Sequence, residues 1–342
     1  MAEALRARGH EVVLLISEKQ VDAEASAKYT QLRFITVPAV AKPATFSLAM
    51  PGYLWRLWGS IRRCKQVLRD SGAQAVLGMG GFTSLAPVYA GHRLGLKTFI
   101  HDSNARPGRA NVLTSRFCTR IFLGLDGAKD FLAGRATLTT GTPVRMEMRQ
   151  LPSREKAAAS FGLDAARPIL VVTGGSQGAH RLNEISAYAA ASLPAETQVL
   201  HIAGASDYDR VVQIVRGRAD YKVLGFCDRM PAVYACADVV VARAGASSLT
   251  EIALAGKPSI LVPYPFAADD HQTRNAEVFA QAGASRLVQE RNLSAEQLAA
   301  LVTTLLRDPQ RLSQMAQAAS SLAMPDAAER VCAAIEATLS AS

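Results

Sequence analysis

ILVVTGGSQGA, at residues 169–179, is the strongest local signal in this 342-residue chain. Its first five residues are typical of a strand buried on both faces, and the glycines after them allow a tight turn before a helical stretch. Backbone N–H groups at the start of such a helix favour a phosphate. The spacing is not GxGxxG and the loop lacks the lysine of a P-loop, which disfavours nicotinamide enzymes and P-loop NTPases. A strand–turn–helix corner without a ligand is the alternative.

Outward from this stretch, short apolar segments alternate with helical ones, a pattern that predicts parallel sheets in an α/β protein. The expected strands are 11–17, 33–37, 75–78, 97–101, 120–123 and 136–139, then 169–173, 198–203, 221–224, 239–242, 259–263 and 285–288. Residues 141–152 are rich in turn-forming residues, and we expect them to link a domain at 1–140 to a second at 153–325. Residues 326–342 are expected to be mainly helical and to pack on either domain.

The composition excludes several classes of protein. Hydrophobic residues make up 49% of the chain and charged residues 20%, which argues against disorder. The five cysteines show no CxxC pairing, so neither a zinc ribbon nor a redox motif is indicated. Residues 1–150 hold 21 Lys and Arg against 10 Asp and Glu, a net +11, whereas residues 151–342 hold 17 against 19, a net −2. The first half should therefore meet an anionic partner such as nucleic acid, a phospholipid surface or an acidic substrate.

A second glycine-containing loop, RAGASSLTE at 243–251, also comes after a predicted strand and precedes a helix. Gly245 and Ala246 permit close approach of a ligand, and Ser247 with Ser248 could cap the helix. Glu251 lies near the helix start, where its carboxylate could accept both hydroxyls of a ribose. A capping box made by Ser248 and Glu251 is the alternative.

A third polar loop, PYPFAADDHQTRN at 263–275, is the last of the three candidate ligand loops in the second half of the chain. Ligands of open parallel sheets bind at the carboxyl ends of the strands, where these loops gather. Asp269, Asp270, His271 and Gln272 offer donors and acceptors suited to sugar hydroxyls. A metal site is the less favoured interpretation, because one histidine and two aspartates lack a further ligand nearby.

The first half carries candidate loops of its own. Gly78, Gly80 and Gly81, within GMGGF at 78–82, could cradle a second phosphate or allow close packing in a turn. His101 and Asp102 end another predicted strand and are candidate general bases; a structural histidine and a loop-capping aspartate are the alternative.

Residues 51–70 contain both tryptophans of the chain, mixed with arginines. An apolar, aromatic surface flanked by arginines is typical of an interfacial membrane helix, and a core helix with a solvated basic face is the alternative. The predicted membrane patch consists of Leu54, Trp55, Leu57, Trp58, Ile61, Arg62 and Arg63.

In order along the chain, GMGGF, HDSN, GTPVR, GGSQGA, RAGASSLTE and DDHQ resemble the motifs of the MurG family of GT-B glycosyltransferases. The resemblance implies two Rossmann-like, doubly wound parallel-sheet domains with a cleft between them, and a C-terminal helix that packs back toward the first domain. It implies an inverting, metal-independent hexosyltransferase without a cofactor. Such an enzyme moves N-acetylglucosamine from UDP-GlcNAc to the C4 hydroxyl of lipid I, undecaprenyl-pyrophosphoryl-MurNAc-pentapeptide, to make lipid II for peptidoglycan. It would lie peripherally on the cytoplasmic face of the bacterial membrane, with anionic phospholipid as a partner.

The resemblance also implies roles for matching residues. The glycines of GMGGF would face the acceptor diphosphate, Ser176 the donor diphosphate, Glu251 the ribose and Gln272 the GlcNAc hydroxyls. Cys227 stands where the family often has isoleucine beside the uracil, a contact made by the backbone. The expected donor set is Asn104, Arg145, Ser176, Gln177, Gly178, Cys227, Arg243, Ala246, Ser247, Ser248, Leu249, Thr250, Glu251 and Gln272.

Some features depart from the family pattern. Asp102 and Ser103 replace a Glu-Gln pair, and Thr142 replaces the asparagine of GNPVR. The family opens with a strand and a GGTGGH loop, and the helical stretch at Met1 matches the helix just after that loop. We therefore expect a natural start roughly 20 residues upstream, and a chain that is inactive or poorly folded without it. A fold that starts on a helix is the alternative.

Two rival functions stay open. A different GT-B enzyme, either another glycosyltransferase or a sugar-nucleotide epimerase, would keep the nucleotide loops and use another acceptor. A catalytically dead scaffold would bind the membrane surface without turnover. Nucleic-acid binding is less favoured, because the basic residues do not interleave with aromatics as they do in known readers.

Overall fold

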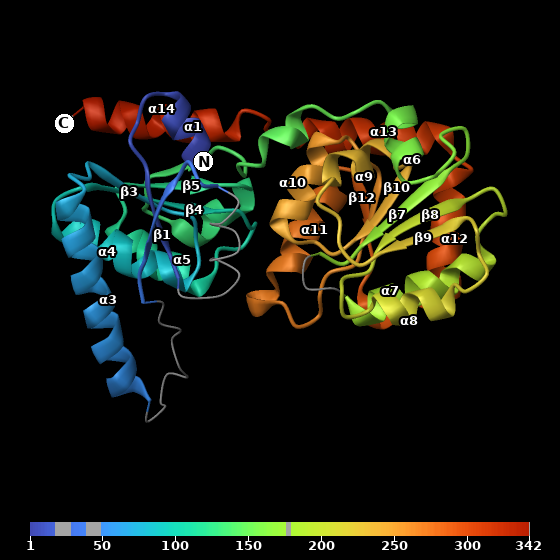
Figure 1. Ribbon diagram of the computed structural model, residues 1–342, viewed down its shortest axis with the longest axis horizontal. Helices are drawn as coiled ribbons and strands as arrows, with labels where there is room; N and C mark the ends of the chain where they lie inside the picture. The colour runs from blue at the N-terminus through green and yellow to red at the C-terminus, as the bar shows by residue number, and fades with distance from the viewer. Residues whose placement is uncertain (18–28, 39–48, 176–178, 342) are drawn as a thin grey trace. The chain divides into compact units, whose positions relative to one another are not determined.

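The computed structural model describes residues 1–17, 29–38, 49–175 and 179–341. The chain divides into two compact units, Met1–Pro143 with Asp326–Ser342, and Val144–Pro325. Both units are α/β with parallel strands (Figure 1), which confirms the predicted fold class.

The sheet of the second unit has the strand order β12-β11-β10-β7-β8-β9, with all pairs parallel. Its strands are β7 (Ile169–Thr173), β8 (Gln198–Ile202), β9 (Tyr221–Leu224), β10 (Val239–Ala242), β11 (Ser259–Leu261) and β12 (Ser285–Leu287). From β7 the chain adds strands first on one side and then, from β10, on the other. The gap between the carboxyl ends of β7 and β10 is therefore the topological switch point, where ligands of doubly wound sheets bind.

Helices cover both faces of this sheet (Figure 1). Ile169 and Val171 of β7 belong to one buried cluster, and Leu170 and Val172 belong to the other. Burial on both faces explains why the strand is a continuous apolar run. The helices are α6 (Arg154–Ser160), α7 (His180–Ala189), α8 (Tyr208–Ile214), α9 (Met230–Cys236), α10 (Ala246–Leu254), α11 (His271–Gln281), α12 (Ala295–Leu306) and α13 (Pro309–Ser321).

The described part of the first unit contains two parallel sheets. One has the order β3-β4-β5-β6 and the other pairs β1 with β2. Leu15 of β1 packs against a buried cluster that includes Val76 of β3, so the two sheets share a core. The strands are β1 (Val13–Ile16), β2 (Arg33–Thr36), β3 (Ala75–Gly78), β4 (Lys97–Asp102), β5 (Arg120–Leu123) and β6 (Thr137–Thr139). The helices are α1 (Ala2–Ala7), α3 (Met50–Asp70), α4 (Leu85–Arg93), α5 (Arg109–Thr114) and α14 (Ala327–Ser340).

Helix α14 belongs to the first unit although it ends the chain (Figure 1). Its Val331 and Ile335 are buried in one cluster with Phe99 of β4. At the surface, Arg8 donates from Nε to Glu336 at 2.8 Å, and the hydrogen bonds from Arg8 and then His10 lower the pKa of the Glu336 carboxyl to about 2. The C-terminal helix thus completes the core of the N-terminal unit.

Candidate functional site

In the second unit, α11 ties together the loops after β10 and β11. The Oε1 atom of Gln272 accepts from the N–H groups of Ala244, at 3.2 Å, and Tyr264, at 2.9 Å. Asn275, which is fully buried, donates from Nδ2 to the Ala244 carbonyl at 3.1 Å. The sequence motifs assigned no role to Asn275. Its position three residues after Gln272, on the same face of a helix, is the signal that could have found it.

Helix α10 begins at Ala246, shortly after the end of β10. Its N-cap is Gly245, and no side chain caps it. The prediction that Ser247 and Ser248 cap this helix, alone or with Glu251 in a capping box, is therefore wrong, because the helix starts early enough to put Ser248 inside its first turn. The first N–H groups of α10 lack a side-chain cap at the switch point, an arrangement that suits an anion.

Glu251 lies further along α10 with a side chain that is only 14% exposed. Its Oε2 accepts from the Tyr234 hydroxyl at 3.2 Å, and its Oε1 lies 3.6 Å from the Arg145 guanidinium. Burial raises the pKa of the Glu251 carboxyl, while Arg145 and Tyr234 oppose that rise. The result is a carboxylate with fixed orientation and few water contacts. Tyr234 was missed because in the sequence it reads as an ordinary core residue of α9.

Arg243 was predicted to bind the donor, but its guanidinium donates to three groups of the protein. It donates to the carbonyls of Val262, at 3.1 Å, and Pro263, at 3.2 Å, and to the Glu290 carboxylate. Its carbon Cζ also lies 5.6 Å from the centre of the Tyr264 ring. In this structure Arg243 therefore holds the backbone of the loop after β11 in place.

The turn before α11 carries backbone strain. Asp269 and Asp270 have φ of 53° and 54°, a left-handed conformation that costs a non-glycine residue roughly 1 kcal/mol or more. The Asp270 carboxylate accepts from the Thr273 hydroxyl at 2.6 Å, which helps to hold the turn. Strain of this kind concentrates at functional sites.

The remaining predicted donor residues of this unit differ in their surroundings. Ser176, Gln177 and Gly178 lie outside the described residues. Leu249 is 1% exposed, so its side chain is part of the core, and the Thr250 hydroxyl donates to the Ala246 carbonyl. Cys227 is partly buried against the core, and burial raises the pKa of its thiol.

In the first unit, His101 and Asp102 are buried and fully engaged. Asp102 accepts from the N–H groups of Asn104, at 2.9 Å, and Gly108, at 3.2 Å, and from Asn111 Nδ2, at 2.6 Å. The His101 ring lies with Nε2 2.9 Å from the Gly141 carbonyl, and burial lowers its pKa. This geometry favours the loop-capping aspartate and structural histidine over general bases.

Asn111 also anchors the glycine loop of this unit. Its Oδ1 accepts from the Gly81 N–H at 3.0 Å. Gly80 and Gly81 have φ of 94° and 79°, and a Cβ on Gly81 would meet nothing within 4 Å, whereas a Cβ on Gly78 would lie 2.8 Å from that of Ser84. Close packing therefore accounts for Gly78, and Gly81 presents its backbone to open space.

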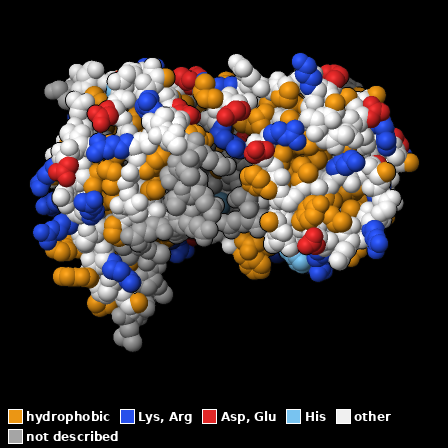
Figure 2. All heavy atoms as spheres, viewed as in Figure 1, with side chains coloured by type: hydrophobic (Ala, Val, Ile, Leu, Met, Phe, Trp, Pro, Cys, Tyr) orange, Lys and Arg blue, Asp and Glu red, His pale blue; other side chains and the backbone are white. Residues whose placement is uncertain are grey.

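Helix α3 separates the predicted membrane patch into two faces. Leu57 and Ile61 pack against the core of the unit, since they lie on the same side of the helix as buried Cys64. Trp55 and Trp58 are 73% and 53% exposed, their rings 5.5 Å apart. The exposed members are Leu54, Trp55, Trp58, Arg62 and Arg63, called the α3 patch below. In Figure 1 the N-terminal half of α3 projects from its unit, and Figure 2 shows apolar and basic side chains together there.

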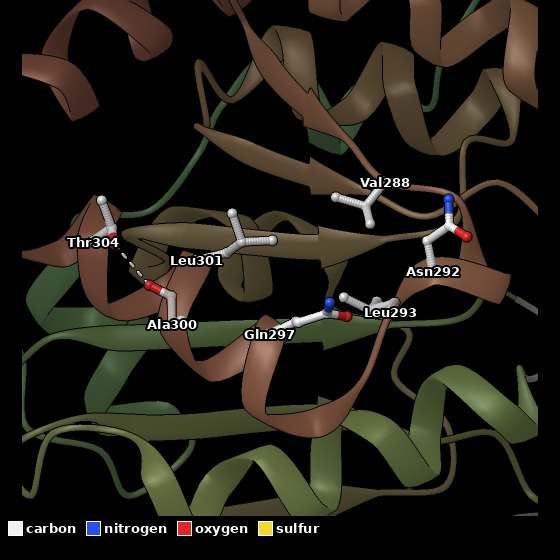
Figure 3. A pocket seen from close by; sticks show the side chains of 7 residues that line it. All are labelled: Val288, Asn292, Leu293, Gln297, Ala300, Leu301 and Thr304. Carbon is white, nitrogen blue, oxygen red and sulfur yellow. Dashed lines mark hydrogen bonds between the residues drawn. The ribbon is translucent and has the colours of Figure 1, made fainter.

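A cavity of about 400 Å³ lies along α12 in the second unit (Figure 3). Gln297 closes a capping box with Ser294, and the Thr304 hydroxyl donates to the Ala300 carbonyl. The side chains that line this cavity are all uncharged, so none of them is a cation that could pair with a phosphate. Its lining consists of Val288, Asn292, Leu293, Gln297, Ala300, Leu301 and Thr304.

Comparisons with known proteins agree along most of the chain. The C-terminal domain of glycosyltransferase family 28 matches residues 169–331, and the N-terminal domain of that family matches residues 1–123. The UDP-N-acetylglucosamine–N-acetylmuramyl-(pentapeptide) pyrophosphoryl-undecaprenol N-acetylglucosamine transferase of Synechococcus elongatus is 40% identical over 283 residues, and its Nostoc counterpart is 37% identical over 279. Each alignment covers 81% of this chain and 77% of the relative.

Among solved structures, MurG of Acinetobacter baumannii superposes with a TM-score of 0.79 at 27% identity. The match covers 98% of this chain and 93% of that one. The chain belongs to the MurG family of hexosyltransferases, which have the GT-B fold, within glycosyltransferase family 28.

Proposed function

We propose that this chain transfers N-acetylglucosamine from UDP-GlcNAc to the C4 hydroxyl of lipid I, with inversion at the anomeric carbon and without a metal ion. The relatives are named for N-acetylglucosamine transfer to an N-acetylmuramyl-(pentapeptide) pyrophosphoryl-undecaprenol. The observation in this chain that carries the proposal is the Glu251 carboxylate, held between Tyr234 and Arg145 on a helix whose N-terminus has no side-chain cap.

This arrangement suits a nucleoside diphosphate. A carboxylate can accept hydrogen bonds from both vicinal hydroxyls of a ribose, whereas helix N–H groups and a guanidinium such as that of Arg145 suit phosphates. Gln272 uses Oε1 for two backbone N–H groups, which leaves its Nε2 amino group to donate to a sugar hydroxyl. In the same proposal residues 176–178 bind the diphosphate and the backbone at Cys227 contacts the uracil.

The proposed reaction is a direct displacement. The acceptor C4 oxygen bonds to the anomeric carbon while the bond from that carbon to the diphosphate oxygen breaks, and the proton of the C4 hydroxyl passes to a general base. UDP departs with increased negative charge, which preoriented helix N–H groups and Arg145 stabilise. The glycine loop at 78–82 would face the acceptor diphosphate, while its Gly81 N–H stays bonded to Asn111.

The acceptor is lipid-bound, and the α3 patch provides a way to reach it. Tryptophans favour the membrane interface, and each arginine near an anionic surface contributes about 1 kcal/mol. We therefore propose a peripheral position on the cytoplasmic face of the bacterial membrane. Among the described residues, no helix has the length and hydropathy of a bilayer span.

The test is to incubate the chain with radiolabelled UDP-GlcNAc and lipid I in the presence of EDTA, then to analyse the lipid fraction. The proposal predicts label in a disaccharide with a β linkage to C4, with no effect of EDTA. Transfer to other acceptors alone would favour a different glycosyltransferase. Isomerised UDP-sugar without acceptor would favour an epimerase, and vesicle binding without any turnover would favour the scaffold.

A further inference from the structure

Two aromatic side chains stand exposed on the loop between β11 and α11. Phe266 is 81% exposed, the largest exposed fraction of any large apolar side chain among the described residues, and Tyr264 is 45% exposed. Their ring centres lie 5.7 Å apart in an edge-to-face arrangement. In Figure 1 this loop, coloured orange, projects beyond the end of α11. Two adjacent exposed rings leave apolar surface in contact with water, and a bound ligand would cover it.

The loop holds these rings in a defined place. The Ala267 N–H donates to the Tyr264 carbonyl at 3.1 Å, and the Asp270 N–H donates to the Ala267 carbonyl at 3.0 Å, which makes two successive turns. The Tyr264 N–H is bound at 2.9 Å by Gln272. Phe266 is thus displayed by a hydrogen-bonded, strained segment.

The Tyr264 ring is also supported by a buried side chain, that of Arg243. The Arg243 guanidinium lies against the Tyr264 ring at 5.6 Å, and Arg243 is itself fixed by Glu290. Tyr264 in turn contacts Phe266 edge to face. A chain of contacts from a buried ion pair to an exposed ring is a preorganised surface, which loses little conformational entropy when a ligand covers it.

The chemistry of this surface matches a sugar ring. One face of a pyranose presents C–H groups with partial positive charge, which pack on the negative face of an aromatic ring. Gln272, bonded to the backbone of Tyr264, supplies a donor for hydroxyls at the edge of such a ring. Small-molecule sites typically combine an aromatic surface with a small number of polar groups beside it.

We infer that Phe266, backed by Tyr264, is a stacking platform for a hexosamine ring of the substrates. The inference rests on the proposed function and deepens it, because it assigns recognition of the sugar to a residue outside the nucleotide loops. The ring belongs either to the donor GlcNAc or to the MurNAc of the acceptor. Both have the same stacking chemistry, so the experiment separates them.

The experiment compares the full chain with its Phe266→Ala, Phe266→Leu and Phe266→Tyr variants. Calorimetric titration with UDP-GlcNAc and with UDP forms the donor arm, and KM for lipid I forms the acceptor arm. If the donor sugar stacks, the Ala and Leu variants bind UDP-GlcNAc roughly three- to ten-fold more weakly and bind UDP unchanged. If the acceptor sugar stacks, the same variants raise KM for lipid I by that factor and leave donor titrations unchanged. The Tyr variant keeps wild-type values in both cases.

Tyr188→Ala removes another exposed aromatic, 57% exposed on α7, and is the matched control expected to change neither arm. The inference is overturned if Phe266→Leu matches the wild type in both arms, or if its binding of UDP and of UDP-GlcNAc weakens equally. A wild-type chain that binds neither UDP-GlcNAc nor lipid I overturns the proposed function and the inference together. A wild-type chain that binds them, with unchanged Phe266 variants, overturns the inference alone.

Discussion

Replacing Glu251 by glutamine removes the charge at the centre of the proposed ribose site and keeps its shape. The amide oxygen can still accept from the Tyr234 hydroxyl, now 3.2 Å from the carboxylate, so the fold of α10 and α9 should persist. The substitution removes a charged acceptor that is 14% exposed and therefore poorly compensated by water.

The size of the effect can be worked out from that burial. A hydrogen bond to a charged group contributes about 1.5–3 kcal/mol, which predicts that Glu251→Gln binds UDP roughly 10- to 100-fold more weakly. The 2′-deoxy analogue of UDP already lacks one of the two bonds, so the same substitution should weaken it by a smaller factor. Calorimetric titration of the wild type and of Glu251→Gln, each with UDP and with 2′-deoxy-UDP, gives a thermodynamic cycle. Its coupling energy measures the contact between Glu251 and the 2′-hydroxyl.

The pH dependence provides a second check on the same carboxylate. Burial raises its pKa above the ordinary value of a glutamate, and only the ionised form accepts from both hydroxyls. Affinity for UDP should therefore fall as pH decreases through that raised pKa, and the fall should be absent in Glu251→Gln. Glu277→Gln, a change in a surface pair with Arg274 at 2.9 Å, is the matched control. Equal losses of UDP and 2′-deoxy-UDP binding would refute a ribose role for Glu251.

Three further predictions concern stability and membrane binding. The buried His201, with a pKa lowered to about 3 by desolvation, is neutral when folded and takes up a proton near pH 6.5 when unfolded. The free energy of unfolding should therefore fall by about 2.5 kcal/mol between pH 7 and pH 4.5. Urea titrations of a His201→Gln variant at both pH values should lack this contribution to the pH dependence. Asn111→Ala removes bonds to two loops and should cost about 2 kcal/mol in the same titrations; a loss below about 0.5 kcal/mol would contradict its anchoring role. Trp55→Ala with Trp58→Ala should weaken binding to anionic vesicles at least ten-fold, whereas Tyr188→Ala should not.

Much of the fold could be predicted from the sequence because its strands are bounded by strong local signals. The run 169–173 forms β7 with the predicted ends, and 239–242 does the same for β10, since each apolar run stops at glycine- or arginine-containing loops. The placement of β7 next to β10 could not be predicted, because local patterns carry no information about which distant strands pair.

The candidate site was predicted less completely, for physical reasons. Polar residues in loops can bond many neighbours, and the sequence does not say that Gln272 binds the backbone of Ala244 and Tyr264. Asp269 and Asp270 adopt left-handed backbone without a glycine to mark it. Glu251 could be predicted because the strand, loop and helix that place it lie in one short stretch of sequence. Its partner Tyr234 lies on a different helix and could not be predicted from that stretch.

Calorimetric titration of the full chain with UDP-GlcNAc, UDP-glucose and UDP-GalNAc is the direct test of the proposed donor site. We expect saturable binding that prefers UDP-GlcNAc, because Gln272 bonds the backbone through Oε1 and its amide N–H groups are proposed to donate to sugar hydroxyls. Equal affinity for the three donors would contradict specific recognition of the sugar. A folded chain that binds none of them would contradict the donor site at the switch point altogether.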